Sequence, residues 1–193
     1  MGEKTQQLIL DAALAEFAQN GFQKTSLKDI AALAGVSRPT VYSFFKNKDQ
    51  IFRSVAISIH ENGLREASAF LQDLSSADVT DAISEALYSR HGKFLSLVIE
   101  TKGGAEMEDE HGRLCGDVVV STQKAFNDQL AGYINKAEAA KRICLSNQGL
   151  SAEQVVTLLN LSVIGCKRGC TSSVEYKERI AHVVTLFFGG LII

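Results

Sequence analysis

The side chains best suited to binding chemistry are concentrated between residues 25 and 48. This stretch offers hydroxyl, ammonium and guanidinium donors, which are the groups that contact DNA phosphates and base edges. Residues 24–53 carry six Lys or Arg against two Asp, a local charge of +4, whereas the whole chain has a net charge of −2. Residues 56–193 carry −4. The charge split predicts a nucleic-acid-binding face at the N-terminal end rather than a chain that is basic throughout.

Within this stretch we assign DNA contacts by side-chain chemistry. Cations and hydroxyls suit phosphates, an Arg suits guanine, and Arg38, Thr40 and Ser43 are our candidates for base edges. Phe44 is suited either to a thymine methyl group or to packing inward. The basic side chains, taken singly, are equally consistent with a solvated surface. The candidate residues are Thr25, Ser26, Lys28, Ser37, Arg38, Pro39, Thr40, Tyr42, Ser43, Phe44 and Lys48.

Short helices must position these side chains. The apolar spacing predicts a first helix over 4–19, and Ser26 is placed to cap a second helix that Gly35 ends. Ser37 is placed to cap a third, with Pro39 in its first turn, where a missing amide hydrogen costs little. A long fourth helix is predicted from 48 to about 72. Two short helices joined by a tight turn form a helix-turn-helix, whose second helix enters the major groove.

This region resembles the tetracycline-repressor (TetR) family of bacterial regulators over Leu8 to about Arg53. The residues that carry the resemblance are Phe17, Gly21, Thr25, Ile30-Ala31, Ala34-Gly35-Val36-Ser37, Thr40, Tyr42, Phe45, Lys48 and Ile51, the last standing where Leu is commoner. The resemblance implies an all-α protein in which a three-helix DNA-binding module (4–64) is joined by a long fourth helix to a helical ligand-binding and dimerisation domain (65–193). It also implies a homodimeric regulator, most simply a repressor that a small molecule releases from double-stranded operator DNA.

Beyond residue 72 the pattern stays helical, and no run of alternating apolar and polar residues predicts a strand. We expect helices near 78–90, 93–101, 109–136, 151–168 and 174–188, with loops at 102–105 and 146–149. In the resembled family the last two helices pair with those of a second subunit. We therefore expect a dimer interface on their apolar stripe, although the same residues would also suit the interior of one chain. The stripe comprises Val163, Tyr176, Ile180, Val184, Phe187 and Phe188.

A second apolar set is our candidate for an effector cavity, although each member alone is more typical of an ordinary core. We expect a largely apolar effector that tilts the long fourth helix and thereby weakens DNA binding. The set comprises Phe70, Leu74, Phe94, Leu97, Val98, Met107, Phe126, Leu130 and Tyr133.

Four cysteines are too few for a disulfide framework and favour a reduced, cytoplasmic protein. The spacing of His111 and Cys115, and of Cys166 and Cys170, fits metal ligands, but neither pair has further ligands nearby in sequence. We therefore expect no metal or other cofactor. A redox role for the second pair stays open, because Lys167 and Arg168 lie beside it.

No membrane association is expected, because the one strongly apolar terminal run is 11 residues long and a spanning helix needs about 20. The chain also lacks a nucleophile elbow, a phosphate loop and a zinc-protease motif, so an enzyme is disfavoured. The alternative to a ligand-released repressor is a DNA-binding structural or protein-recruiting factor without a ligand.

Overall fold

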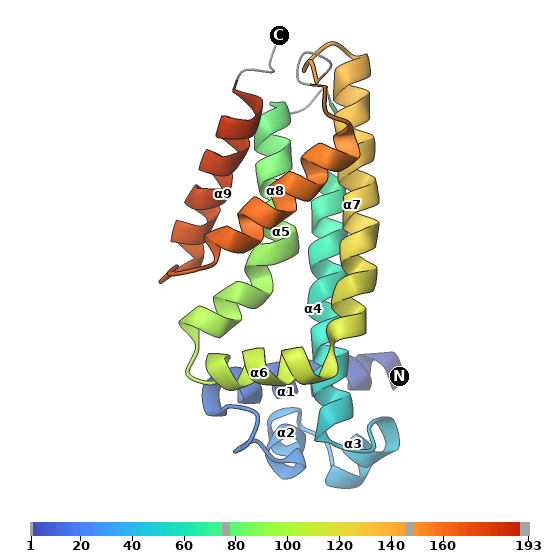
Figure 1. The fold of residues 1–193 in the computed structure, drawn as a ribbon. Helices are drawn as coiled ribbons and strands as arrows, with labels where there is room; N and C mark the ends of the chain where they lie inside the picture. The colour runs from blue at the N-terminus through green and yellow to red at the C-terminus, as the bar shows by residue number, and fades with distance from the viewer. Residues whose placement is uncertain (1, 75–77, 146–148, 190–193) are drawn as a thin grey trace. The chain divides into compact units, whose positions relative to one another are not determined.

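The computed structural model describes residues 2–74, 78–145 and 149–189, and within these residues the chain is helical without β-strands (Figure 1). This confirms the predicted all-α class. In chain order the helices are α1 (Gly2–Asn20), α2 (Leu27–Leu33), α3 (Arg38–Phe44), α4 (Lys48–Phe70), α5 (Val79–Glu100), α6 (Gly104–Leu114), α7 (Gly116–Ala139), α8 (Ala152–Cys166) and α9 (Ser173–Phe188).

The starts of α2 and α3 and the turn between them follow local signals. The Ser26 hydroxyl accepts a hydrogen bond from the Asp29 amide while the Asp29 carboxylate accepts one from the Ser26 amide, which forms a capping box at the start of α2. The Ser37 hydroxyl accepts from the Thr40 amide at the start of α3. Gly35 has φ of 67°, a left-handed conformation that glycine adopts without strain, so the chain turns sharply between the two helices.

Two predicted boundaries were wrong. The helices expected at 78–90 and 93–101 are one helix, α5, because Gly92 lies inside it, where a Cβ would be 2.5 Å from the Tyr88 ring. The helix expected at 109–136 is instead divided at Cys115 into α6 and α7, and α6 begins within the expected loop at 102–105. In the first case the glycine marks a close contact with a side chain of the same helix and not the end of the helix. The loop expected at 146–149 lies mostly outside the described residues.

The chain divides into two compact units. The first contains residues up to 60 together with 96–119, and the second contains 61–95 and residues from 120 onward. Most of the region 4–64 therefore belongs to the first unit, which also includes α6. Helix α4 contributes residues to both units.

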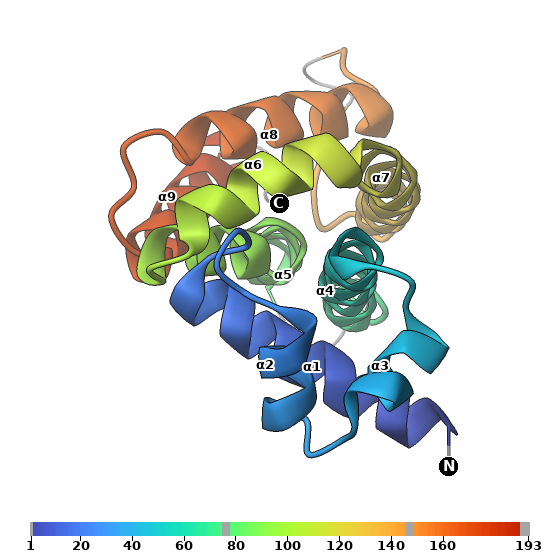
Figure 2. The ribbon, with the colours of Figure 1, turned by 90° about the horizontal axis from the view of Figure 1, so that it is seen from below.

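The first unit is organised around a buried aromatic cluster. The rings of Phe17, Phe22 and Phe52 lie 5.4–5.5 Å apart, and Ile30 and Val41 bring the inner faces of α2 and α3 onto the same core. Figure 2 shows α2 and α3 beside α1. Each such side chain contributes about 1.5–3 kcal/mol through burial. The core therefore holds the helix-turn-helix rigidly.

Helix α6 packs on the end of α1 through a backbone contact. The Gly103 amide donates to the Ala18 carbonyl oxygen at 2.8 Å. A Cβ on Gly103 would lie 2.0 Å from the Phe17 carbonyl oxygen and 2.7 Å from the Gly21 nitrogen. These are backbone atoms of a packed helix end, so they have little room to move. Only glycine fits this close approach.

We expect Gly103→Ala to lower the free energy of unfolding by about 2–3 kcal/mol through overpacking. Gly112→Ala is the matched control on the same helix, since a Cβ there meets nothing within 4 Å. Because alanine favours helix over glycine, the control should stabilise the protein by up to about 1 kcal/mol. Urea unfolding measures both changes, and equal effects of the two substitutions would contradict this packing.

The second unit contains a buried polar network as well as an apolar core. The amide of Asn160 on α8 bonds to His91 of α5 and to Asn127 and Gln123 of α7, at 2.9–3.1 Å. Such a network fixes one arrangement of these helices, because any other would leave buried polar groups without partners.

Among the described residues, none of the helices has the length and apolarity needed to cross a membrane.

Candidate nucleic-acid interface

Helix α3 turns its polar residues outward. Arg38, Pro39, Tyr42 and Ser43 are exposed, whereas Val41 is buried. The Arg38 guanidinium donates to the Tyr42 hydroxyl at 3.1 Å and lies 5.4 Å from the centre of its ring. The two side chains are one helical turn apart and support each other. Helix α3 therefore presents to solvent a cation and a phenol that are held together.

The hydroxyl groups of α3 are largely used within the helix. Ser37 and Thr40 share a hydrogen bond between their hydroxyl oxygens at 2.8 Å, and the Ser43 hydroxyl donates to the Thr40 carbonyl oxygen at 2.7 Å. Ser37 and Ser43 remain exposed, and Thr40 is half-buried. Each hydroxyl oxygen has a second lone pair, so the exposed ones can still accept or exchange a bond with an incoming ligand.

The start of α2 presents Ser26 and Lys28 to solvent but hides Thr25. Thr25 is 3% exposed, and its hydroxyl donates to the Gly21 carbonyl oxygen at 2.8 Å. Its side chain is therefore buried and bonded within the turn before α2, whereas Ser26 and Lys28 are open to solvent. Hydrogen bonds from Ser26 lower the pKa of Asp29, so the capping carboxylate stays ionised at a lower pH than an ordinary Asp.

Lys48 acts as a clamp on this turn. Its ammonium donates to the carbonyl oxygens of Phe22, Gln23 and Thr25 at 2.6, 3.2 and 2.9 Å, and it lies 4.3 Å from the centre of the Phe22 ring. All three hydrogens of an ammonium group are thereby used. The half-buried Lys48 thus joins the start of α4 to the segment that precedes α2, and its charge is less available to DNA than the sequence suggests.

A shallow concavity of about 430 Å³ brings the starts of α2 and α3 together. Lys28 and Arg38 supply its exposed cations, and the half-buried Lys48 supports its wall. Phe44 is not part of it: this half-buried side chain packs against the core cluster, which answers the question that its sequence left open. The lining residues are Thr25, Ser26, Leu27, Lys28, Arg38 and Lys48.

Helix α6 supports the same turn from another direction, which the sequence interpretation missed. The Glu106 carboxylate accepts from the Gln23 amide at 2.8 Å, and Glu110 accepts from the Gln23 side chain at 3.2 Å. Arg113 bridges Glu110 and Asp49, the latter at 3.0 Å. The sequence offered little signal for these contacts, because Gln23 is uncharged and the ion pair between α6 and α4 joins Arg113 to Asp49 across 64 residues.

Arg53 is also engaged within the first unit. Its guanidinium forms a bidentate pair with Asp117 at 2.5–2.7 Å and donates to the Leu114 carbonyl oxygen at 2.6 Å. The hydrogen bonds and charge of Arg53 lower the pKa of Asp117 to about 2. Arg53 thus fastens the junction of α6 and α7 to α4.

Comparison with known proteins agrees with this geometry. Residues 9–55 match the family model of bacterial regulatory proteins, tetR family. The transcriptional regulator AcrR of Shigella flexneri is 35% identical over 153 residues, which are 78% of this chain and 69% of AcrR. The chain belongs to the TetR family.

Other TetR-family relatives match mainly over the DNA-binding region. The "Probable acrEF/envCD operon repressor" of Escherichia coli K12 is 46% identical over 52 residues, 27% of this chain and about a quarter (24%) of that protein's length. SmeT, the repressor of the Stenotrophomonas maltophilia multidrug efflux pump SmeDEF, superposes with a TM-score of 0.68 at 20% identity, covering 97% of this chain and 90% of SmeT. That likeness shows a shared fold.

The residues expected to line an effector cavity in this TetR-family protein are divided between the two units. Leu97, Val98 and Met107 belong to the first unit, where Met107 is buried in the aromatic core and Leu97 packs against it. Met107 and Leu97 therefore belong to the core of the unit that carries the helix-turn-helix, and Val98 is half-buried in the same unit. The second unit holds Phe70, Leu74, Phe94, Phe126, Leu130 and Tyr133.

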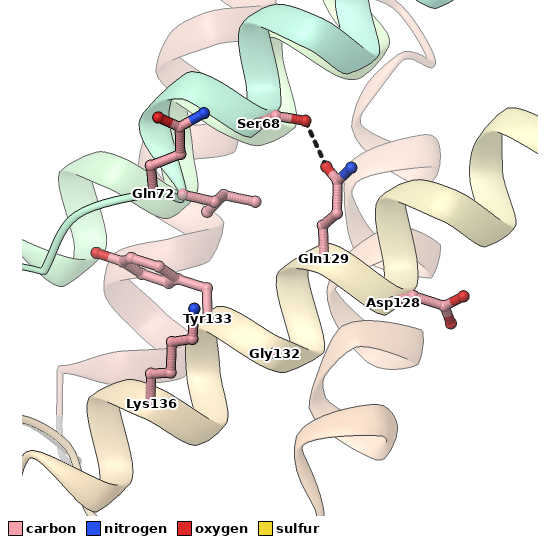
Figure 3. A pocket seen from close by; sticks show the side chains of 8 residues that line it. Ser68, Gln72, Asp128, Gln129, Gly132, Tyr133 and Lys136 are labelled. Carbon is pink, nitrogen blue, oxygen red and sulfur yellow. Dashed lines mark hydrogen bonds between the residues drawn. The ribbon is translucent and has the colours of Figure 1, made fainter.

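One member of that set, Tyr133, lines a groove of about 390 Å³ in the second unit (Figure 3). On one side of the groove are Ser68, near the end of α4, and Gln72, which follows that helix. On the other side are Gln129 and Lys136 of α7. The Ser68 hydroxyl donates to the Gln129 side-chain oxygen at 2.7 Å. In the part of the chain that the structure describes, the buried Tyr133 hydroxyl has no hydrogen-bond partner. The groove is thus more polar than the predicted cavity.

The stripe expected at the dimer interface is mostly internal. Val163, Tyr176, Ile180, Val184 and Phe188 have no exposed surface within the single chain, and Phe187 is half-buried. The Tyr176 hydroxyl donates to the Val163 carbonyl oxygen at 3.2 Å, so the stripe packs α9 against α8. The exposed apolar side chains of these helices are instead Leu158, Leu161, Ile164, Val174 and Leu186.

The pair His111 and Cys115 and the pair Cys166 and Cys170, whose spacing fits metal ligands, have different surroundings. His111 faces His60, with their Nε2 atoms 2.7 Å apart, and Cys115 is fully buried with its thiol pKa raised by that burial. Within the described residues, no three His, Cys, Asp or Glu side chains lie together as metal ligands would. Cys166 and Cys170 occupy the turn between α8 and α9.

Proposed function

We propose that this TetR-family protein is a sequence-specific DNA-binding transcriptional repressor that binds its operator as a homodimer and is released by a small molecule. The observation that carries the proposal is the outward face of α3, where Arg38 and Tyr42 are held together on a capped helix. Lys28 and Ser26 lie beside it across the concavity. This arrangement offers one group for a base edge and others for phosphates.

The contact roles follow from exposure. Arg38 is the base-reading candidate, because its guanidinium can form two parallel hydrogen bonds to guanine. Lys28 and Ser26 are phosphate candidates, together with Tyr42 and Ser43. Thr25 and Lys48 hold the turn that positions them, so we assign these two residues supporting roles.

The homodimer is proposed to form through the exposed faces of α8 and α9. Half of the large apolar side chains that are exposed in the described chain lie on these two helices. Exposed apolar side chains gathered on two helices that pack together support a protein interface there. A dimer also places two recognition helices on successive turns of one DNA face, about 34 Å apart.

The effector is proposed to act on the second unit. SmeT also has a solved complex with triclosan, and that structure superposes on this chain with a TM-score of 0.64 at 20% identity, over 98% of this chain and 92% of that one. In the present protein, Tyr133 and Ser68 line a groove to which α4 contributes. Because α4 carries Lys48 in one unit and Ser68 in the other, a ligand that prefers one conformation of this helix would bias the DNA-binding turn.

The function is tested by selecting a duplex from a random pool and measuring affinities at several salt concentrations. Arg38→Ala should weaken operator binding by about 1–3 kcal/mol, with relaxed preference at one base pair and little effect on random DNA. Lys28→Ala should weaken binding to both duplexes by the same factor. It should also reduce by about one the slope of log affinity against log salt concentration. Lys124→Ala, an exposed lysine on α7, is the control and should change neither. Identical effects of Arg38→Ala on both duplexes would refute base reading.

Release is tested with triclosan as the probe. We expect it to weaken operator binding, and linkage requires that the operator duplex lower the affinity for triclosan by the same factor. Calorimetric titration with and without duplex measures that factor. Equal affinities would contradict release by this class of ligand.

A further inference from the structure

The turn between α8 and α9 brings two cysteines together. Cys166 is the last residue of α8, and Gly169 has φ of 70°, which reverses the chain. The Cys170 amide donates to the Lys167 carbonyl oxygen at 3.2 Å, closing a tight turn. The Cys170 thiol then donates to the Cys166 carbonyl oxygen at 3.0 Å. The Cys170 sulfur is therefore already in contact with the backbone of Cys166.

This turn is fastened by α9. Arg179 donates to the carbonyl oxygens of Cys166 and Arg168 at 2.9 and 2.8 Å, and its other terminal nitrogen bonds to Glu175 at 2.5 Å. The Cys166 carbonyl oxygen thus has two donors. If the Cys170 sulfur turned away to form another bond, Arg179 would still satisfy that oxygen, so the movement leaves no buried acceptor without a partner.

The two thiols differ in access. Cys166 is partly exposed, whereas Cys170 is 9% exposed. Burial raises the pKa of the Cys170 thiol, and the nearby Arg179 charge opposes part of that increase. A dissolved oxidant therefore meets Cys166 first, and Cys170 is the neighbour placed to react with the product. This is the usual division between an attacked and a resolving cysteine.

We propose that Cys166 and Cys170 are a redox-responsive pair that a hydroperoxide converts to an intramolecular disulfide. In the first step the Cys166 thiol gives up its proton, and the thiolate attacks one peroxide oxygen while the O–O bond breaks. The displaced oxygen takes up that proton, so the products are a sulfenic acid and, with hydrogen peroxide, water. In the second the Cys170 sulfur attacks the Cys166 sulfur and displaces hydroxide, which takes up the thiol proton and leaves as water. The two thiols lose two electrons and two protons, and the peroxide gains both.

The disulfide would tie the end of α8 to the residue that leads into α9. It would replace the Cys170 thiol hydrogen bond with a covalent link while the Arg179 contacts persist. The proposal stands on these residues alone and does not depend on DNA binding. Its failure would leave the proposed repressor function unaffected.

The test treats the reduced full chain with a small excess of hydrogen peroxide after the reductant is removed. Titratable thiols under denaturing conditions should fall from four to two, and the intact mass should fall by about 2 Da. Trypsin cleaves after Lys167 and Arg168, so the two cysteines fall on different peptides, 143–167 and 169–177. These peptides should be joined without reductant and separate with it.

Matched variants assign the bond. Cys144 shares the first peptide, so Cys144→Ser should still yield the linked pair, starting from three thiols. Cys166→Ser and Cys170→Ser should each abolish it. The proposal is overturned if wild type keeps four thiols, if Cys144→Ser abolishes the link, if either of the other variants still loses two thiols, or if the main product is a disulfide between two chains or a sulfinic acid.

Discussion

We expect Lys48→Met to lower the melting temperature of the protein by roughly 5–15 °C and to weaken binding to operator and random duplexes by similar factors. The ammonium of Lys48 holds three backbone carbonyl oxygens of the turn before α2. Hydrogen bonds from charged donors are stronger than neutral ones, and we estimate the loss as about 2–4 kcal/mol of unfolding free energy. DNA binding falls because Ser26 and Lys28 lose their fixed position.

Lys46→Met is the matched control. Lys46 is exposed, lies two residues earlier and carries the same charge, so its replacement should change stability by no more than about 0.5 kcal/mol. Calorimetry and DNA titration across salt concentrations measure both variants. If Lys48→Met melts like wild type and simply reduces the salt slope, Lys48 is a phosphate contact and the clamp interpretation fails.

The second large effect is expected at the surface of α8 and α9. Leu161→Glu combined with Leu186→Glu should raise the dimer dissociation constant at least about a hundredfold, because two carboxylates would have to be desolvated without partners. The side chains are 64% and 83% exposed, so the monomer should keep its fold and melting behaviour. Operator affinity should fall with the dimer, because a single recognition helix buries too little surface.

Val120→Glu provides the control for this prediction. Val120 is 70% exposed and belongs to α7 rather than to α8 or α9, so a carboxylate there should leave the oligomeric state unchanged. Sedimentation velocity over a range of concentrations distinguishes the variants. A double variant that still sediments as a dimer would place the interface elsewhere, and an unfolded one would show that these side chains are part of the interior.

The sequence by itself determined the local structure of the DNA-binding segment. Ser26, Gly35 and Ser37 each act on backbone groups within four residues, so their effects are visible in the spacing of residue types. The same holds for Arg38 and Tyr42, which are one turn apart on a short helix. The family, the all-α class and the outward face of α3 were therefore predictable without coordinates.

Only the tertiary structure decided which groups distant in sequence meet. A lysine in the sequence is simply a cation, and the carbonyl oxygens that engage Lys48 come from a turn about 25 residues away. The inclusion of α6 in the first unit depends on Gly103 approaching α1. Apolar periodicity likewise shows that one face of α9 is buried, but it does not show which helix covers that face. In the single chain that face packs on α8, so the dimer that we propose uses exposed residues elsewhere on these helices.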